Sequence, residues 1–362
     1  MYKIMIGPNK YVQGPGLIRE AGAYVKLLGK KANLLGDKTV LSLVEETLRG
    51  GLEKQNISTV ASTFRGECSN QEIDRITGIC RDEKVDIVIG AGGGKTLDTA
   101  KAVGHYLKIP TVIIPTIAAT DAPTSSLAVI YGEDHGHQGY ILLDKNPDLI
   151  LVDTEIIANA PPRFFISGMG DALATRFEAE ACARSSGKNL PGGIPSLAAL
   201  TLAKLTYDIL MEYGLEAKRA VEEKAVTPAV EKVVEANILL SGLGFESGGL
   251  AAAHAIQIGL TTAREASKTY HGEKVAFGTL VQLIMEGRTT DETVKVVKFC
   301  TAVGLPVTLS ALEISTEEVP QIAEEARKQN IMRNMPFSVT PKLVSDCILM
   351  ADSLGKSLME EQ

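Results

Sequence analysis

Residues 85–96 have the sequence VDIVIGAGGGKT. The first half is a β-branched apolar run, which is typical of a buried parallel strand with helices over both faces. A glycine-rich turn follows, and then a helical stretch at Leu97–Val103. Glycines let backbone amides approach an anion closely, and a helix N-terminus adds partial positive charge. The segment therefore predicts an α/β fold with a phosphate or pyrophosphate site at residues 90–96.

Two standard phosphate-binding patterns fail at this loop. A P-loop requires glycine at the position of Ile89, and the dinucleotide pattern GxGxxG requires glycine at the position of Lys95. A strand-to-helix turn that binds nothing is the alternative. Three consecutive glycines before a helix cost chain entropy, however, unless close backbone approach is needed.

The two halves of the chain have different patterns. Short apolar runs alternate with helical stretches up to about residue 155, at Ala32–Gly36, Val85–Gly90, Thr111–Pro115 and Leu149–Asp153. This alternation predicts βαβ units and a parallel sheet. Later stretches have helical spacing instead, at Leu197–Met211, Ala225–Ser241 and Leu250–Leu260. We expect a Rossmann-like α/β domain at residues 1–160 and an all-α domain at 161–362, with cofactor and substrate in the cleft between them.

Bulk properties narrow the class of protein. The chain has 362 residues and a net charge of −7, which disfavours nucleic acid as a partner. It has no apolar run long enough for a membrane span and no signal peptide at its start. Its five cysteines form no CxxC pair, so buried, reduced thiols are expected. We expect a cytoplasmic globular protein.

Three residues form a candidate metal set. His254 is a lone polar ring in an apolar, small-residue helix, and His271 opens a new helix 17 residues later. Asp171 follows a Gly-Met-Gly turn and is expected to start a third helix. This spacing is not a diagnostic motif. A helix N-cap for Asp171 and a core histidine for His254 are the alternatives. His135 and His137 lie at an expected hairpin tip and are not expected to bind metal.

Asp37 ends an earlier strand. A carboxylate at the C-terminal edge of a strand can accept hydrogen bonds from ribose hydroxyls and repels a 2′-phosphate. An ordinary loop aspartate is the alternative.

Several ordered motifs carry a family resemblance. They are PNKYVQG at 8–14, GGGKTLDTAK at 92–101, PTIAATDAP at 115–123, GDALAT at 170–175, GLGFESGGLAAAH at 242–254 and HGEKVAFG at 271–278. With them the chain resembles the iron-containing (group III) alcohol dehydrogenase superfamily over essentially its full length, and within it the glycerol dehydrogenases. The resemblance implies the dehydroquinate-synthase-like architecture of that superfamily.

The resemblance also assigns roles to residues. It implies that Asp171, His254 and His271 bind one divalent metal, usually zinc, although the ligand types also admit iron, cobalt or manganese. It places Asp121 beside the substrate. It implies an NAD groove formed by Asp37, Gly93, Gly94, Lys95, Thr96, Asp98, Thr116, Ala119, Ser125, Leu127 and Tyr131. The chain departs from the relatives at Thr175, Gln257 and Arg333, where a histidine is common.

The implied function is NAD- and metal-dependent oxidation of glycerol to dihydroxyacetone, in a homo-oligomer that the resemblance suggests is an octamer. The alternatives are a glycerol-phosphate dehydrogenase, a dehydroquinate-synthase-like lyase and a P-loop phosphotransferase. The first two need converging basic side chains for a phosphorylated substrate. Near His254 and His271 the sequence offers Arg264 and Lys268 as basic candidates, which favours a neutral polyol.

Asp37 generates a prediction about cofactor choice. The protein should prefer NAD over NADP, because the carboxylate opposes a 2′-phosphate. Asp37→Gly should narrow the ratio of kcat/KM for the two cofactors. Equal use of both by the unmodified protein would remove Asp37 from this role.

Overall fold

The computed structural model describes residues 1–132 and 137–360. Its main sheet has six strands in the order β1-β8-β5-β4-β2-β3, and every neighbouring pair is parallel. The strands are β1 Tyr11–Gly14, β2 Lys31–Gly36, β3 Ser58–Thr63, β4 Ile87–Gly92, β5 Thr111–Pro115 and β8 Leu149–Asp153. A separate antiparallel pair is formed by β6 Leu127–Tyr131 and β7 His137–Leu142.

The central strands are buried on both faces, as their continuous apolar runs predict. Ile87 and Ile89 join one hydrophobic core, while Val88 between them joins another. This alternation follows from the two-residue period of a strand. The first core lies under α1 Ala21–Val25 and α2 Lys38–Glu53, and the second continues from the sheet into the helical half of the chain.

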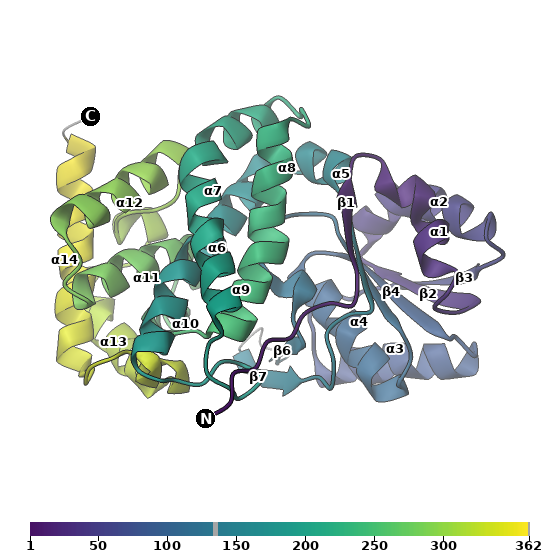
Figure 1. Ribbon diagram of the computed structural model, residues 1–362, viewed down its shortest axis with the longest axis horizontal. Coiled ribbons are helices and arrows are strands. Elements are labelled where there is room, and N and C mark those ends of the chain that lie inside the picture. Colours follow the sequence, from purple (N-terminus) through teal and green to yellow (C-terminus); the bar gives the residue numbers. More distant parts are fainter. Residues whose placement is uncertain (133–136, 361–362) are drawn as a thin grey trace.

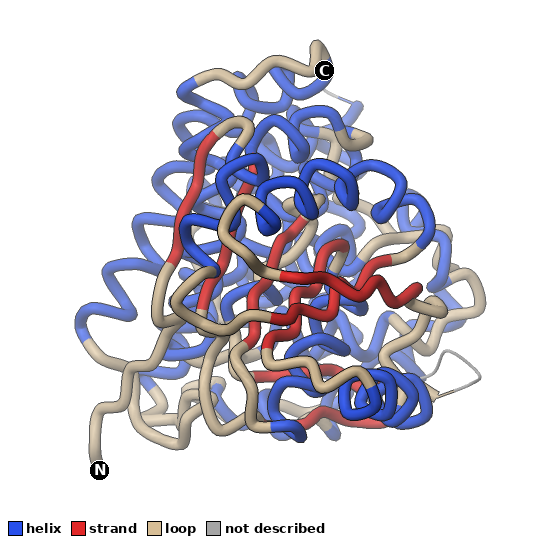
Figure 2. Tube along the Cα trace, turned by 90° about the vertical axis from the view of Figure 1, so that its right-hand side faces the viewer, coloured by secondary structure: helices blue, strands red, loops and turns tan. Residues whose placement is uncertain are grey.

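Helices make up the rest of the molecule (Figure 1). Beside the sheet lie α3 Asn70–Asp82, α4 Gly94–Leu107 and α5 Thr154–Asn159. The helical half comprises α6 Pro162–Arg184, α7 Leu197–Glu222, α8 Pro228–Glu235, α9 Ser241–Gly248, α10 Ala252–Leu260, α11 His271–Met285, α12 Thr290–Val303, α13 Val319–Lys328 and α14 Pro341–Glu360. Figure 2 shows the strands gathered in one part of the molecule, with helices around and behind them. The predicted fold class, an α/β sheet domain followed by a helical domain, is confirmed.

The strand order contains a reversal that matters for ligand binding. From β2 the chain moves outward to β3, then returns to β4 on the other side of β2 and continues to β5 and β8. In open α/β sheets, ligands bind outside the C-terminal strand ends at such a point. Here those ends are Gly36–Asp37 and Gly92–Gly94.

The predicted strands are present, with shifted bounds in two of them. Strand β2 begins one residue before the predicted run, at Lys31. The run predicted at Val85–Gly90 begins two residues later as β4, because the Val85 amide bonds to the Cys80 carbonyl and closes the end of α3. The edge strands β1 and β3 were not predicted. Strand β3 has exposed polar residues rather than a continuous apolar run, since an edge strand is less fully covered.

The predicted helix start at Asp171 is wrong. Asp171 lies inside α6, nine residues after the first residue of this helix, Pro162. The glycines that suggested a turn serve close packing instead. A Cβ on Gly168 would lie 1.8 Å from the Ala118 carbonyl oxygen, and one on Gly170 would lie 2.3 Å from the Gly272 carbonyl oxygen.

The hairpin predicted around residues 131–140 agrees with the antiparallel pairing of β6 and β7. His137 begins β7. His135 lies outside the described residues.

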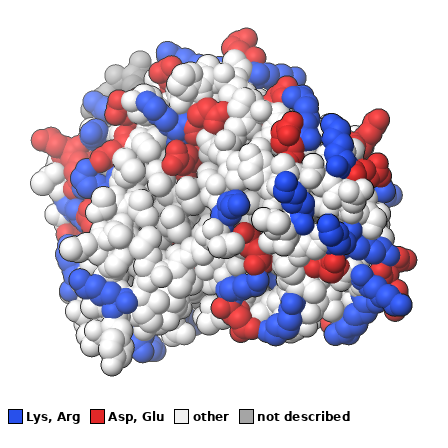
Figure 3. Space-filling view, turned by 45° about the vertical axis from the view of Figure 1, so that its right-hand side comes forward, with Lys and Arg blue, Asp and Glu red and all other residues white. Residues whose placement is uncertain are grey.

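The visible surface in Figure 3 mixes lysines and arginines with aspartates and glutamates, and a broad area carries neither. Among the helices of residues 1–132 and 137–360, none combines the length and hydropathy that a membrane span needs.

Gly168 provides a test of the close packing around α6. An alanine in an open helix position normally stabilises by up to about 1 kcal/mol relative to glycine. Gly168→Ala should instead destabilise by about 1–3 kcal/mol, because the added carbon meets backbone. Gly78→Ala is the matched control, since Gly78 lies inside α3 with no atom within 4 Å of its Cβ position. Urea unfolding of both variants measures the difference. A stabilised Gly168→Ala protein would contradict the packing argument.

Candidate active site

The predicted metal set comes together in the structure. Asp171 of α6, His254 of α10 and His271 at the start of α11 offer ligand atoms that all lie within 4.8 Å of one another. Asp171 Oδ1 is 3.3 Å from His254 Nε2 and 3.1 Å from His271 Nε2. Asp171 is 1% exposed, whereas the His271 side chain is 38% exposed. The cluster is therefore buried on one side and open on the other.

These separations fit a divalent cation. Zinc binds histidine nitrogen and carboxylate oxygen at about 2.0–2.2 Å, so neighbouring ligand atoms in a tetrahedral site lie about 3.4 Å apart. The two measured distances from Asp171 Oδ1 are close to that value. Three protein ligands also leave a position for water or a substrate oxygen. The residues present therefore fit the metal that the resemblance implies.

Asp121 lies directly against this cluster. It follows β5 by a short loop, and its backbone N–H donates to Asp171 Oδ2 at 3.2 Å. Its own Oδ2 accepts from the Ser241 hydroxyl at 2.7 Å, and Ser241 in turn bonds to the Thr175 hydroxyl at 2.8 Å. Asp121 Oδ1 has no hydrogen-bond partner among the described residues. One carboxylate oxygen is therefore fixed and the other remains available to a ligand.

The electrostatics of the cluster are dominated by buried carboxylates. Burial, and next the charge of Asp171, raises the pKa of Asp121 well above its usual range. Burial opposes ionisation of Asp171, but His271 and His254 outweigh it and lower the pKa of that carboxyl. No Lys or Arg side chain bonds to either carboxylate among the described residues. A divalent cation would supply the missing positive charge.

Two nearby polar residues were not predicted from the sequence. Glu178 is fully buried in α6 and its Oε2 lies 2.6 Å from His254 Nδ1. A sequence pattern was available, because an acid seven residues after Asp171 lies on the same helix face. Ser241 follows a π-helical turn at Ala236–Leu240, a feature that hydrophobic periodicity does not reveal.

The glycine loop leads into α4 as predicted. Gly93 is the N-cap of α4 and no side chain caps this helix, so the first N–H groups remain available to an anion. Gly92 has φ 149°, a conformation that favours glycine. A Cβ on Gly94 would lie 3.7 Å from the Thr120 hydroxyl, so the loop approaches the segment before Asp121.

The residues expected along the cofactor groove fall into two groups. Leu127 and Tyr131 are half-buried on the same face of β6 as Val129, which was not expected in the groove, while Ala128 and Ile130 are buried. Lys95 and Thr96 open α4, and Thr116 and Ala119 lie on the loop after β5.

Two other expected groove residues, Asp98 and Ser125, contact Lys101 instead. Lys101 Nζ lies 2.8 Å from Asp98 Oδ1 and donates to the Ser125 hydroxyl at 3.2 Å. Asp98 also accepts from the Val129 amide at 2.9 Å. These side chains hold α4 against the β6 segment. Lys95 itself forms an ion pair with Glu67 at 2.6 Å and lies 4.7 Å from the centre of the Tyr131 ring.

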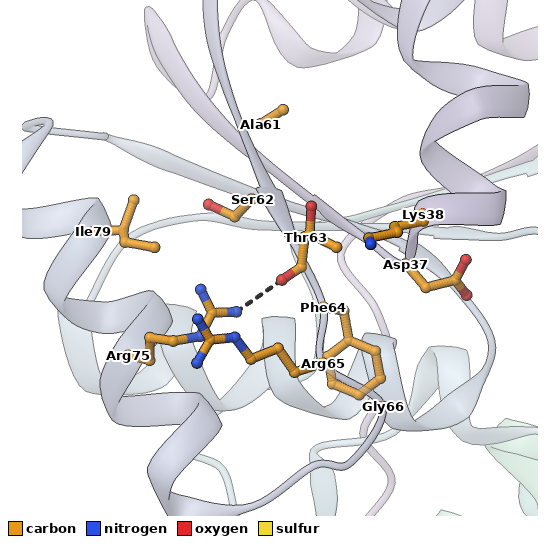
Figure 4. Close-up of a pocket in the computed structure, with 10 residues that line it drawn as sticks. All are labelled: Asp37, Lys38, Ala61, Ser62, Thr63, Phe64, Arg65, Gly66, Arg75 and Ile79. Carbon is orange, nitrogen blue, oxygen red and sulfur yellow. Dashed lines mark hydrogen bonds between the residues drawn. The ribbon is translucent and has the colours of Figure 1, made fainter.

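Asp37 has a structural role in addition to the cofactor-binding role expected from the sequence. It is the N-cap of α2, where its Oδ1 accepts from the Val40 amide at 2.8 Å. It also lines an open cavity of about 700 Å³ at the C-terminal ends of β2 and β3 (Figure 4). Arg65 and Arg75 face the same cavity, and Arg75 is bound to Glu72 and to the Thr63 carbonyl.

Two of the three departures from the relatives, Gln257 and Arg333, differ in exposure. Gln257 is 7% exposed, one helical turn after His254, whereas Arg333 is exposed. The environment of the cysteines does not favour a thiolate. All five are free and buried, as predicted, and burial raises their thiol pKa values, to about 12 for Cys68 and about 11 for Cys80.

The chain is similar to known proteins over its full length. The sequence profile of the family described as iron-containing alcohol dehydrogenase matches residues 8–154. The glycerol dehydrogenase of Escherichia coli O6:H1 is 46% identical, with 100% of both chains covered. A glycolaldehyde reductase of Halobacterium salinarum is 44% identical over 99% of this chain and 100% of its own. The crystal structure of glycerol dehydrogenase from Schizosaccharomyces pombe has a TM-score of 0.96 at 38% identity, covering 99% of this chain and 93% of that one.

The parallel sheet with its glycine loop and the Asp–His–His cluster in the helical half define an oxidoreductase with a metal site. The chain belongs to the iron-containing alcohol dehydrogenase family, so the family resemblance seen in the sequence is confirmed.

Proposed function

We propose that this protein oxidises glycerol to dihydroxyacetone, with NAD as hydride acceptor and one zinc ion held by Asp171, His254 and His271. The observation that carries the proposal is the convergence of these three ligands beside the unpartnered oxygen of Asp121. The full-length identity to glycerol dehydrogenases supports the choice of substrate.

The chain's own residues would orient the substrate and handle its proton. The cation, when bound, supplies Lewis-acid chemistry that lowers the pKa of an alcohol, and NAD accepts the hydride. Asp121 Oδ1 is placed to accept a hydrogen bond from a polyol hydroxyl, because Ser241 holds the other oxygen. An ionised Asp121 could also accept the proton of that hydroxyl.

The cofactor would lie across the C-terminal strand ends. In this proposal the N-terminus of α4, at Gly93, Gly94, Lys95 and Thr96, receives the pyrophosphate, and Asp37 receives the adenosine ribose. The exposed face of β6, with Leu127 and Tyr131, and the Thr116–Ala119 loop complete the groove. The side chains of Asp98 and Ser125 contact Lys101. These two residues would therefore contribute to the groove indirectly, through the position of Lys101 and through their own backbone.

A neutral substrate agrees better with the basic side chains near the cluster than a phosphorylated one. Arg163 is bound to Glu273, Lys268 to Glu265 and Glu313, and Lys274 to backbone carbonyls. Arg264, the other basic candidate, is exposed, and only its backbone N–H forms a hydrogen bond among the described residues. The preference for a neutral substrate therefore rests on the first three side chains. The 44% identity to a glycolaldehyde reductase adds small hydroxyaldehydes, reduced in the reverse direction, as a second candidate substrate class.

The proposal includes the domain organisation expected from the sequence, with domains at residues 1–160 and 161–362 and the active site between them. It also includes a cytoplasmic location and a homo-oligomer, which the family resemblance suggests is an octamer.

The metal proposal predicts the effect of chelation. NAD reduction with glycerol should disappear after dialysis against a chelator and return with zinc, and glycerol phosphate should not be a substrate. Asp171→Asn and His254→Ala should lose bound zinc while keeping the far-UV circular dichroism of the parent. His105→Ala is the control, because His105 lies at the end of α4, outside the cluster. Full activity in a metal-free preparation would contradict the mechanism.

Asp121 has a separate test. Asp121→Asn keeps the shape of the side chain and removes its charge. The value of kcat/KM for glycerol should therefore fall by a factor that corresponds to about 1–3 kcal/mol of lost transition-state stabilisation, while the affinity for NAD barely changes. Asp153→Asn is the control. Asp153 is also buried, at the end of β8, but among the described residues its side chain accepts only from the amides of Gly16, Ile18 and Glu155. Its loss should therefore lower the melting temperature and spare kcat/KM. If the Asp121 variant behaves like this control, Asp121 is structural.

A further inference from the structure

Glu178 makes contacts that the proposed reaction has not used. It is fully buried in α6, seven residues after Asp171. Its Oε2 lies 2.6 Å from His254 Nδ1, and its Oε1 accepts from the amides of Ala251 and His254 at 2.8 and 2.9 Å. Every partner of this carboxylate is therefore in the segment that carries His254.

These contacts decide which nitrogen of His254 can bind a metal. A carboxylate that already accepts two backbone amides accepts a further hydrogen bond from a ring N–H. His254 Nδ1 is therefore engaged by Glu178, which leaves Nε2 as the ring nitrogen that can bind a metal. Nε2 is the atom that faces Asp171 Oδ1 at 3.3 Å. Helix α6 therefore contacts both ring nitrogens of His254, Nε2 through Asp171 and Nδ1 through Glu178.

His271 shows the contrast. Its Nε2 also faces Asp171 Oδ1, at 3.1 Å, but its side chain is 38% exposed. Its Nδ1 has no hydrogen-bond partner among the described residues. Of the two histidines, only His254 has a carboxylate that sets both its tautomer and its orientation.

We propose that Glu178 is a positioning residue that fixes His254 as the preorganised ligand of the metal site. The inference rests on the metal site proposed above and assigns Glu178 no contact with substrate. A carboxylate bonded to the distal nitrogen of a metal-binding histidine raises ligand basicity and fixes the ring, and its loss typically costs 10–100-fold in metal affinity.

Glu178 also caps the N-terminus of α10, and the test must distinguish this role from its contact with the His254 ring. Helix α10 begins at Ala252, and its N-cap Ala251 has no side chain that can cap it. Glu178 accepts two of the amides there, while Gln282 of α11 accepts the Ala253 amide at 2.9 Å. Loss of either residue removes a cap, but only Glu178 contacts the His254 ring.

The decisive variant is Glu178→Gln. If the amide oxygen accepts from the backbone N–H groups, the NH₂ group faces Nδ1 and forces the ring proton onto Nε2. If the oxygen accepts from Nδ1, the NH₂ group faces two buried backbone donors. No orientation of glutamine satisfies both sides, so zinc binding should weaken about 10–100-fold. Gln282→Met is the matched control, because it removes a cap from the same helix without touching the ring.

The experiment compares the zinc dissociation constants of the parent, Glu178→Gln and Gln282→Met by competition with a chromophoric chelator. The visible absorption of the cobalt-loaded proteins reports the ligand field. Both variants should melt lower than the parent, but only Glu178→Gln should lose affinity and change the cobalt spectrum. Unchanged affinity in Glu178→Gln, or an equal loss in Gln282→Met, would overturn the inference while leaving the metal site in place. A parent that binds no zinc would overturn both.

A measurement on the parent covers the case in which Glu178→Gln does not fold. In zinc-loaded protein labelled with ¹⁵N-histidine, the Nδ1 proton of His254 should exchange slowly with water, because Glu178 accepts it in a buried hydrogen bond. The Nδ1 proton of His271, whose side chain is 38% exposed, should exchange rapidly. Equally fast exchange of the two protons would show the inference to be wrong.

Discussion

The site depends on backbone contacts that only glycine allows. A Cβ on Gly272 would lie 1.8 Å from the Ser167 carbonyl oxygen, and one on Gly168 would lie 1.8 Å from the Ala118 carbonyl oxygen. These contacts bring α11 and the loop after β5 directly against α6. His271 and Asp121 thereby reach Asp171 from two different parts of the chain. Side chains at these glycines would separate the three segments by more than a hydrogen bond can span.

This close packing has an electrostatic consequence. Asp121, Asp171 and Glu178 are all buried, and none is bonded to a lysine or arginine among the described residues. Burying a carboxylate without a positive partner is costly. Hydrogen bonds from Ser241, from the backbone and from His254 satisfy part of this need. A divalent cation at the open side of the cluster would satisfy the rest, so metal binding and the stability of this region are expected to be linked.

The loop from Thr116 to Asp121 connects the two halves of the proposed chemistry. At one end the Thr116 amide bonds to the Gly92 carbonyl at 3.1 Å, beside the glycine loop. At the other end the Asp121 amide bonds to Asp171. The segment is short, so the position of the helix N-terminus that would hold the cofactor is tied to the position of the metal ligands. A hydride acceptor and a substrate must keep a fixed separation, and this loop provides a physical means.

The sequence alone determined the fold class, the buried strands at Thr111–Pro115 and Leu149–Asp153, the glycine loop before α4 and the candidate ligands, because periodicity and glycine placement are local properties. The family motifs then assigned their roles. The prediction from sequence placed a helix start wrongly at Asp171, because a glycine needed for a tertiary contact cannot be distinguished in the sequence from one needed for a turn. It did not reveal Glu178 or Ser241. Their importance comes from contacts with His254 and Asp121, which lie 76 and 120 residues away along the chain, and only the packing of α6, α9 and α10 decides which buried polar groups meet.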